Sequence, residues 1–214
     1  MIYLIGEDIF EGVENLILTK IKFFNFQVNL NDFDALIITS KNALKSLIIN
    51  NIKINKNINI YTLGQQSANI AYEMGFKNIK ISKRSYAKDL LKEFLPELKI
   101  QKCLYLRAKE ISSNLDNKMK YENIDFTQII AYENISKEPN IKELIHPAIF
   151  IFTSSLGVKN FLSYFNFDLK DKIIAIGKST AKELSIYKDQ LYISQKQDLK
   201  YCIALAKKLN KLMP

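Results

Sequence analysis

A strand–helix pattern occurs twice along this chain in the same order. Each copy has an apolar strand followed by Thr-Ser and a helix, and then a second strand followed by Gly and another helix. The matching segments are Thr39-Ser40 and Thr153-Ser154, Gly64 and Gly177, and Ile81-Ser82 and Ile193-Ser194, which lie 114, 113 and 112 positions apart. Three matches at nearly constant spacing predict two α/β units of similar design.

Short apolar segments alternate with helical patterns through most of the sequence. The expected strands are Ile2–Ile5, Ala35–Thr39, Ile58–Leu63, Ile79–Ser82, Cys103–Arg107, Phe126–Tyr132, Ile149–Thr153, Ile173–Ile176 and Leu191–Ser194. The expected helical segments include Ala43–Ile49, Ala68–Met74, Leu90–Leu95, Val158–Phe165 and Leu199–Leu209. Because most of these strands are continuously apolar, we predict an α/β fold with buried, doubly wound parallel sheets and right-handed crossovers.

The charge of the chain favours a small anionic partner over nucleic acid. Lys and Arg total 31 against 22 Asp and Glu, which gives a formal charge of +9 in 214 residues. Only Arg84 and Arg107 are arginines, and the lysines are scattered along the chain. Nucleic-acid binders more often cluster their charge and use arginine forks, so we expect no nucleic-acid partner. A basic surface still attracts small polyanions.

The sequence contains no signal for export or membrane insertion. The sequence has no run of about 18 apolar residues, which is the length that a membrane-spanning helix needs. The first eight residues, Met1 to Asp8, lack the basic and apolar regions of a signal peptide. The two cysteines, Cys103 and Cys202, lie within apolar patterns far apart in sequence. We therefore expect a cytoplasmic protein with reduced, buried cysteines and no membrane partner.

The repeated polar residues stand where a parallel sheet binds ligands. Each Thr-Ser pair and each Gly-x-x-(Ser/Thr)-Ala segment follows a strand and opens a helix, where free N–H groups and hydroxyls favour a carboxylate or phosphate. The candidate hydroxyl residues are Thr39, Ser40, Ser67, Thr153, Ser154 and Thr180. The alternative is that they serve only as helix N-caps. Two adjacent hydroxyls, present in duplicate, favour a ligand.

Other chemistry is sparse. The phosphate-binding Gly-x-x-x-x-Gly-Lys-(Ser/Thr) and dinucleotide-binding Gly-x-Gly-x-x-Gly motifs are absent, so we expect no nucleotide cofactor. We also expect no metal, because the sequence has no Cys/His cluster. The only histidine, His146, fits a surface or capping role better than catalysis. Tyr132 ends the strand between the two repeats, where its phenol could donate a proton or simply pack.

The ordered set of motifs resembles the uroporphyrinogen-III synthase family over residues 32–209. These motifs are Ile37-Ile38-Thr39-Ser40-Lys41-Asn42-Ala43, Leu63-Gly64-Gln65-Gln66-Ser67-Ala68, Cys103-Leu104-Tyr105-Leu106-Arg107, Tyr132-Glu133, Phe152-Thr153-Ser154 and Ile176-Gly177-Lys178-Ser179-Thr180-Ala181. The resemblance implies two doubly wound α/β domains joined by a two-stranded linker, with a cleft between them. One domain would combine residues 1–26 and 136–214, the other would span 33–127, and the linker strands would cover 27–32 and 128–135.

The resemblance also implies a reaction and a site. Family members close hydroxymethylbilane, a linear tetrapyrrole with eight carboxylates, to uroporphyrinogen III with loss of water and inversion of the last ring. By this resemblance Tyr132 assists departure of the hydroxyl. We expect no cofactor and a monomeric enzyme. The implied substrate-binding residues are Thr39, Ser40, Gly64, Ser67, Arg107, Thr153, Ser154, Gly177, Lys178 and Thr180.

Two alternatives and one departure accompany this interpretation. From the residues alone, the chain could instead be a two-domain protein that clamps an organic anion without turnover, or a nucleotide- or sugar-phosphate enzyme on the same kind of fold. The departure lies after the first strand, where family members usually carry a full helix. Here Gly6-Glu7-Asp8 follows the strand and residues 11–19 are short for a helix and loop. We therefore expect an abbreviated first α/β element.

Overall fold

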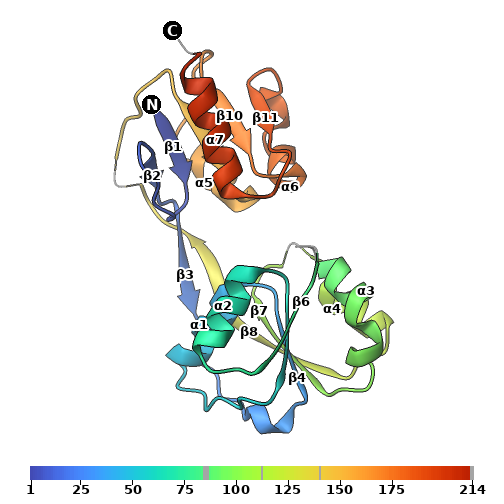
Figure 1. Cartoon of the computed structure of the whole chain (residues 1–214). Helices are drawn as coiled ribbons and strands as arrows, with labels where there is room; N and C mark the ends of the chain where they lie inside the picture. The colour runs from blue at the N-terminus through green and yellow to red at the C-terminus, as the bar shows by residue number, and fades with distance from the viewer. Residues whose placement is uncertain (84–86, 112, 140, 213–214) are drawn as a thin grey trace. The chain divides into compact units, whose positions relative to one another are not determined.

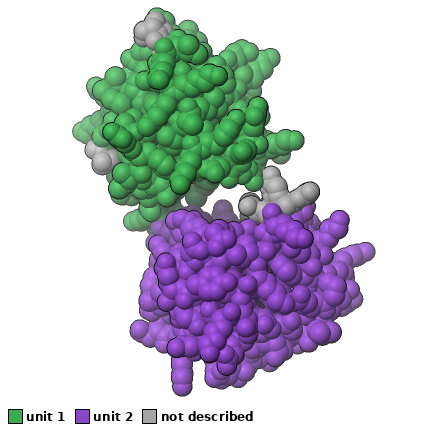
Figure 2. Space-filling view, in the orientation of Figure 1, with its two compact units in different colours: residues 1–20, 135–214 green, residues 21–134 purple. Residues whose placement is uncertain are grey.

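Two β-sheets, one in each of two units, organise the chain in the computed structural model (Figure 1). The structure describes residues 1–83, 87–111, 113–139 and 141–212. Unit 1 is discontinuous and combines residues 1–20 with 135–214, whereas unit 2 is formed by residues 21–134 (Figure 2). None of the helices within the described ranges is long and apolar enough to cross a membrane.

Unit 2 is built on a sheet with the strand order β3-β8-β7-β4-β5-β6, in which β8, β7, β4, β5 and β6 run parallel. Its strands are β3 (Thr19–Phe23), β4 (Ala35–Ile38), β5 (Asn59–Thr62), β6 (Asn78–Ile81), β7 (Cys103–Ala108) and β8 (Phe126–Ser136). Its helices are η1 (Leu30–Asp32), α1 (Lys41–Ile49), α2 (Gln65–Glu73), α3 (Ala87–Leu98) and α4 (Leu115–Tyr121). The apolar residues of α1 and α2 pack on one face of the sheet, and those of α3 and α4 pack on the other.

Unit 1 repeats this design with the strand order β11-β10-β9-β1-β2, all parallel. Its strands are β1 (Ile2–Ile5), β2 (Glu14–Leu16), β9 (Ile149–Phe152), β10 (Lys172–Ala175) and β11 (Leu191–Ile193). Its helices are α5 (Ser155–Leu162), α6 (Lys178–Lys182), η2 (Ser185–Tyr187) and α7 (Leu199–Asn210). Residues of α5 and α6 cover one face and those of α7 cover the other, which confirms the doubly wound prediction.

The strand register confirms the internal repeat. Ala35 of β4 pairs with Asn59 of β5, and Ile149 of β9 pairs with Lys172 of β10, so both strand pairs share one alignment. On the other side, Ala35 pairs with Cys103 of β7. Ile149 correspondingly pairs with Ile2 of β1, the first strand of the chain. The N-terminal strand therefore occupies in unit 1 the place that β7 occupies in unit 2.

The chain passes between the two units within two strands. The sequence predicts linker strands over 27–32 and 128–135. Residues 128–135 lie within β8 (Phe126–Ser136), whereas residues 27–32 form no strand and follow β3 (Thr19–Phe23). The units divide within β3 and within β8. Residues beyond β3 do not extend the strand because Asn50 occupies their backbone groups. Its Oδ1 accepts from the Phe26 N–H at 3.0 Å, and its Nδ2 donates to the Phe24 carbonyl at 3.1 Å.

The first α/β element is abbreviated, as expected. Residues 6–13, all of which the structure describes, join the parallel strands β1 and β2 without a helix. Parallel neighbours usually need a longer helical crossover. Here the Asn15 side chain holds the short connection by donating to the Gly6 carbonyl at 2.8 Å and to the Asp8 carbonyl at 3.0 Å.

Candidate functional site

The predicted polar residues of unit 2 lie at the carboxyl ends of neighbouring parallel strands. Thr39 and Ser40 follow β4, and Gly64 and Ser67 lie at the start of α2 beyond β5. Because β4 and β5 are paired in parallel, their carboxyl ends share one edge of the sheet. This is the edge at which doubly wound sheets bind ligands.

The adjacent hydroxyls of Thr39 and Ser40 serve two different neighbours. Ser40 is the N-cap of α1, and its Oγ accepts from the Asn42 N–H at 3.2 Å. Ser40 is also a neighbour of the Tyr132 phenol and lowers the pKa of that phenol. Thr39 is likewise a neighbour of Tyr105 and lowers the pKa of its phenol. The capping alternative therefore accounts for Ser40 alone, while Thr39 is directed to a different tyrosine.

Tyr132 lies in β8 beside a β-bulge. Its register partner is Ala108, and the irregularity falls between Arg107 and Ala108 of β7. Only 4% of Tyr132 is exposed, and its ring lies 6.4 Å from that of Phe23. Burial raises the pKa of Tyr132 above its usual value of 10, and the Ser40 interaction opposes this shift. The phenol therefore retains its proton at neutral pH and can act as a donor.

Two buried hydroxyls of unit 2 were not among the predicted site residues. The Tyr105 phenol and the Thr62 Oγ1 are both buried and have no hydrogen-bond partner in the described part of the chain. The Thr39 interaction with Tyr105 therefore falls short of a full hydrogen bond in geometry. Each unpaired buried hydroxyl destabilises the fold by about 1–3 kcal/mol. Comparing the repeats could have singled out Thr62, because the matching position of unit 1 is Ala175.

Arg107 is held by internal partners. Its Nε donates to Gln128 Oε1 at 2.9 Å, and one amino nitrogen donates to the carbonyls of Ala108 and Lys109 at 2.9 and 3.0 Å. These bonds secure the bulge and the chain that follows β7. The guanidinium thus has a structural role here, and its other amino nitrogen has no partner among the described residues.

The matching residues of unit 1 follow β9. Ser154 caps α5, its Oγ accepting from the Gly157 N–H at 3.0 Å, as Ser40 caps α1. Thr153 Oγ1 donates to the Ile5 carbonyl at 3.3 Å, so this threonine is occupied by the neighbouring strand. Thr153 and Thr39 therefore differ in their bonding even though they match in the repeat.

The segment after β10 places Gly177, Lys178 and Thr180 around a short helix. Helix α6 has only five residues, which limits the dipole that we expected to attract an anion. The ammonium group of Lys178 is exposed, whereas Thr180 is 2% exposed and its hydroxyl makes no hydrogen bond to a described residue. A Cβ on Gly177 would lie 2.6 Å from Gln197 Nε2, so the glycine allows Gln197 to approach. At Gly64 the corresponding space is open.

The other reactive side chains lie outside these clusters. His146 Nδ1 is 2.8 Å from the buried Asp171 Oδ2, and both residues precede the amino ends of their strands. Burial raises the pKa of Cys103 to about 12 and also raises that of Cys202, so both thiols stay protonated. Among the described residues, no three His, Cys, Asp or Glu side chains converge to hold a metal ion.

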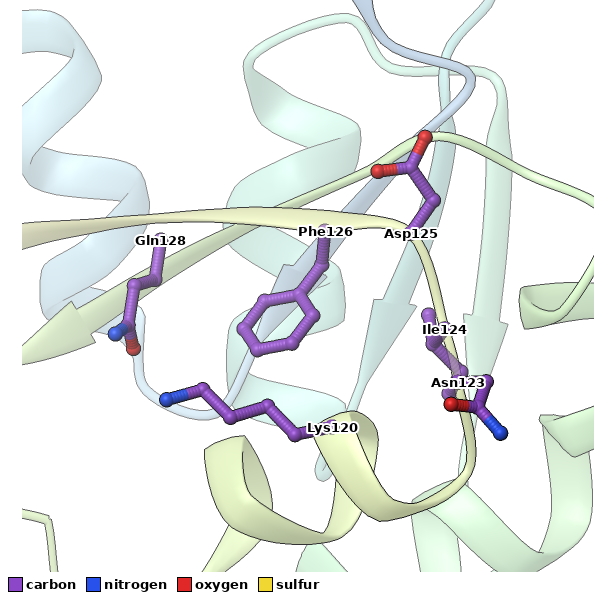
Figure 3. Close-up of a pocket in the computed structure, with 6 residues that line it drawn as sticks. All are labelled: Lys120, Asn123, Ile124, Asp125, Phe126 and Gln128. Atoms are coloured by element: carbon purple, nitrogen blue, oxygen red, sulfur yellow. The ribbon is translucent and has the colours of Figure 1, made fainter.

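A surface hollow of about 520 Å³ lies elsewhere on unit 2 (Figure 3). It is formed by the end of α4, the following turn and the first half of β8. Its lining residues are Lys120, Asn123, Ile124, Asp125, Phe126 and Gln128. Tyr132 lies further along β8, towards its carboxyl end, and is not part of this lining. Gln128 of the lining accepts from Arg107, so this predicted residue borders the hollow.

Comparisons with known proteins agree with the geometry. Residues 19–204 match the family described as Uroporphyrinogen-III synthase HemD. A solved uroporphyrinogen-III synthetase from Helicobacter pylori is 32% identical and superposes with a TM-score of 0.78, covering 97% of this chain and 98% of its own. A mutant uroporphyrinogen III synthase from the extremely thermophilic bacterium Thermus thermophilus is 13% identical, with a TM-score of 0.58 and 98% of each chain covered, and so supports the fold alone. No curated protein matches the chain.

Proposed function

Because the chain belongs to the uroporphyrinogen-III synthase family, we propose that its helix-start hydroxyl and amide donors bind the carboxylates of a linear tetrapyrrole. The protein is a cyclising hydro-lyase of tetrapyrrole biosynthesis that converts hydroxymethylbilane to uroporphyrinogen III. What remains to be assigned is how its own residues carry out this reaction.

The reaction makes modest covalent demands on the protein. The nitrogen lone pair of the terminal pyrrole expels the hydroxyl group, which leaves as water once it gains a proton, and an electrophilic azafulvene remains. Attack on the azafulvene methylene by the substituted α-carbon of the last ring gives a spirocyclic pyrrolenine. The bond from that carbon to its original bridge then breaks, and the freed bridge carbon bonds to the other α-carbon of the same ring, which loses a proton. The ring is thereby inverted. Without the enzyme, direct closure gives the type I isomer. The protein must therefore supply a proton and a folded substrate geometry, and orientation can contribute several kcal/mol.

Substrate binding falls to hydroxyls and helix-start amides in both units. In unit 2 we assign carboxylate contacts to Thr39, Ser40, Gly64 and Ser67. In unit 1 we assign them to Thr153, Ser154, Gly177, Lys178 and Thr180. The assignment is supported by the position of these residues after parallel strands and by the exposed Lys178 ammonium. Arg107 takes part only through its remaining amino nitrogen, since its other donors are occupied.

Tyr132 is the proposed proton donor for the departing hydroxyl. Its support is chemical, because burial keeps the phenol protonated and Ser40 lies beside it. A phenol that stays protonated at neutral pH can donate to the hydroxyl as it leaves. Ser40 then has two tasks, as helix cap and as neighbour of the donor.

The single observation that carries this assignment is the duplicated set of hydroxyls at the carboxyl edges of two sheets with matching register. The direct test supplies purified protein with hydroxymethylbilane and separates the uroporphyrin isomers after oxidation. We expect type III to predominate. Type I product alone, at the rate seen without protein, would favour an anion-binding protein without turnover.

Replacing Thr180 by Val should raise the KM for hydroxymethylbilane and the Kd for uroporphyrinogen III roughly three- to tenfold, because one hydroxyl contact to a carboxylate is lost. The melting temperature should change little, since the hydroxyl has no partner among the described residues. Steady-state kinetics and equilibrium binding measure the two constants.

Thr127→Val is the matched control, because Thr127 is exposed on the amino half of β8. It should leave both constants unchanged. A lower melting temperature for Thr180→Val with an unchanged KM would show that Thr180 only packs and does not bind substrate.

We further propose that the enzyme is a cytoplasmic monomer. Both cysteines are free and buried, as is usual for proteins that stay in a reducing compartment. Each unit carries its own set of proposed binding residues, so no second copy is required to complete either set. Light scattering after size-exclusion chromatography should give the mass of one 24.8 kDa chain, and a doubled mass would contradict the monomer.

A further inference from the structure

The Tyr105 phenol is a buried polar group at the edge of the proposed site. Tyr105 is 0% exposed, and its phenol oxygen has no hydrogen-bond partner within the described ranges. Folded proteins pair nearly all buried polar atoms, and each exception calls for an explanation. Because an unpaired hydroxyl lowers stability, the phenol at this position needs a reason beyond packing.

The fold itself does not require a hydroxyl at this position. Tyr105 of β7 pairs with Ile37, and in the repeat Leu4 of β1 pairs with Ile151, which matches Ile37. Leu4 is also fully buried. A purely apolar side chain thus serves in the equivalent strand of unit 1. The hydroxyl of Tyr105 is therefore specific to unit 2.

Thr39 is the polar neighbour of this phenol. Side chains alternate along a strand, so Thr39 lies on the same face as Ile37, one step closer to the carboxyl edge than the pair formed by Ile37 and Tyr105. Ser40 then falls on the opposite face, near Tyr132. Burial raises the pKa of Tyr105, so its phenol keeps a proton that it can donate.

We propose that Tyr105 is a positioning residue, which donates a hydrogen bond to the Thr39 hydroxyl when Thr39 donates its own proton to a substrate carboxylate. This inference rests on the substrate-binding role proposed for Thr39. A hydroxyl can donate one hydrogen bond and accept two, so both bonds can form together. Hydrogen bonds in such a chain strengthen one another.

The first test is Tyr105→Phe, which removes only the hydroxyl. We expect the KM for hydroxymethylbilane and the Kd for uroporphyrinogen III to rise roughly three- to tenfold while kcat stays within about twofold, because the contact is made by substrate and product alike. The melting temperature should be unchanged or raised, since an unpaired polar atom is lost. A residue that only packs would leave KM and Kd unchanged.

The second test is a double-mutant cycle with Thr39→Val. If Tyr105 acts through Thr39, adding Tyr105→Phe to Thr39→Val should change neither constant further. Tyr61→Phe is the matched control, because Tyr61 is a buried tyrosine of β5 whose hydroxyl donates to Glu97 at 2.7 Å. It should lower the melting temperature without raising KM.

The outcomes separate this inference from the assignment on which it rests. If Thr39→Val leaves KM and Kd unchanged, the binding role of Thr39 is wrong, and the role of Tyr105 is wrong with it. If Thr39→Val raises both constants and Tyr105→Phe does not, only the role of Tyr105 is overturned. If Tyr105→Phe raised KM and Kd equally in the wild type and in Thr39→Val, the phenol would contact the substrate directly. That result would also contradict a positioning role.

Discussion

Tyr132→Phe should lower kcat for type III formation by roughly ten- to a hundredfold while the enzyme remains folded. The phenol is the proton donor that we assign to the leaving hydroxyl, and phenylalanine preserves the ring that packs near Phe23. This expected loss of kcat is at or below the smallest rate contribution usual for a general acid, because the pyrrole nitrogen already helps to expel the hydroxyl group. Isomer-resolved turnover and circular dichroism measure the two properties.

The pH dependence makes this experiment sharper. Burial raises the pKa of Tyr132, so the phenol stays protonated through neutral pH and loses its proton only above its usual value of 10. The ratio of wild-type to Tyr132→Phe turnover should therefore be constant between about pH 6 and 9. Tyr3→Phe is a suitable control, since Tyr3 is also buried and its hydroxyl accepts from the Ile145 N–H. If the Tyr132→Phe variant turned over substrate as fast as the wild type, Tyr132 would only pack and would not donate the proton.

Asp171→Ala should lower the free energy of unfolding by about 3 kcal/mol. The carboxylate is 0% exposed and accepts from the Ala148 N–H at 2.8 Å and the Asp168 N–H at 2.6 Å. It also lies 2.8 Å from His146 Nδ1. Alanine would leave these donors without their acceptor at the amino ends of β9 and β10. Urea unfolding followed by circular dichroism measures the loss.

Asp168→Ala provides the matched control for this prediction. Asp168 is an exposed aspartate three positions earlier, and within the described ranges its side chain accepts only from the Lys170 N–H at 3.0 Å. Its replacement should change the unfolding free energy by less than about 1 kcal/mol. Both variants should retain wild-type KM under native conditions, because the carboxyl edges of the sheets are unaffected. Equal stability of Asp171→Ala and wild type would contradict the role given to this carboxylate.

Most of the fold followed from local patterns, and the exceptions have identifiable causes. The continuously apolar strands were predicted to within one or two residues in most cases, because full burial leaves a run of apolar side chains. Helix α4 was missed because only Leu115 and Met119 of its seven residues are buried. Strand β2 was missed because it has three residues and only Leu16 is buried. Such short, mostly polar elements are stabilised by their neighbours and carry little periodicity.

The candidate site was predictable only in part. Thr39 and Ser40 could be identified because they directly follow a strand, and the strand determines their position. Tyr105 could not, since a tyrosine in an apolar strand looks the same whether or not its hydroxyl is paired. Arg107 looked available from sequence, but Gln128 and two carbonyls occupy most of its donors. Whether a side chain is hydrogen-bonded depends on the residues around it in the folded protein, and these are not evident from its place in the sequence.

Two α/β units of one design, and the hydroxyls that follow their strands, could be read from the amino-acid sequence alone. These features are encoded within a few consecutive residues, by apolar runs and the polar residues that end them. The family resemblance implied that residues 1–26 join the second repeat, but the three-dimensional contacts were needed to show that β1 pairs with β9. They were also needed to show that the Tyr105 phenol lacks a partner among the residues described. Both depend on contacts between segments distant along the chain, which no local pattern records.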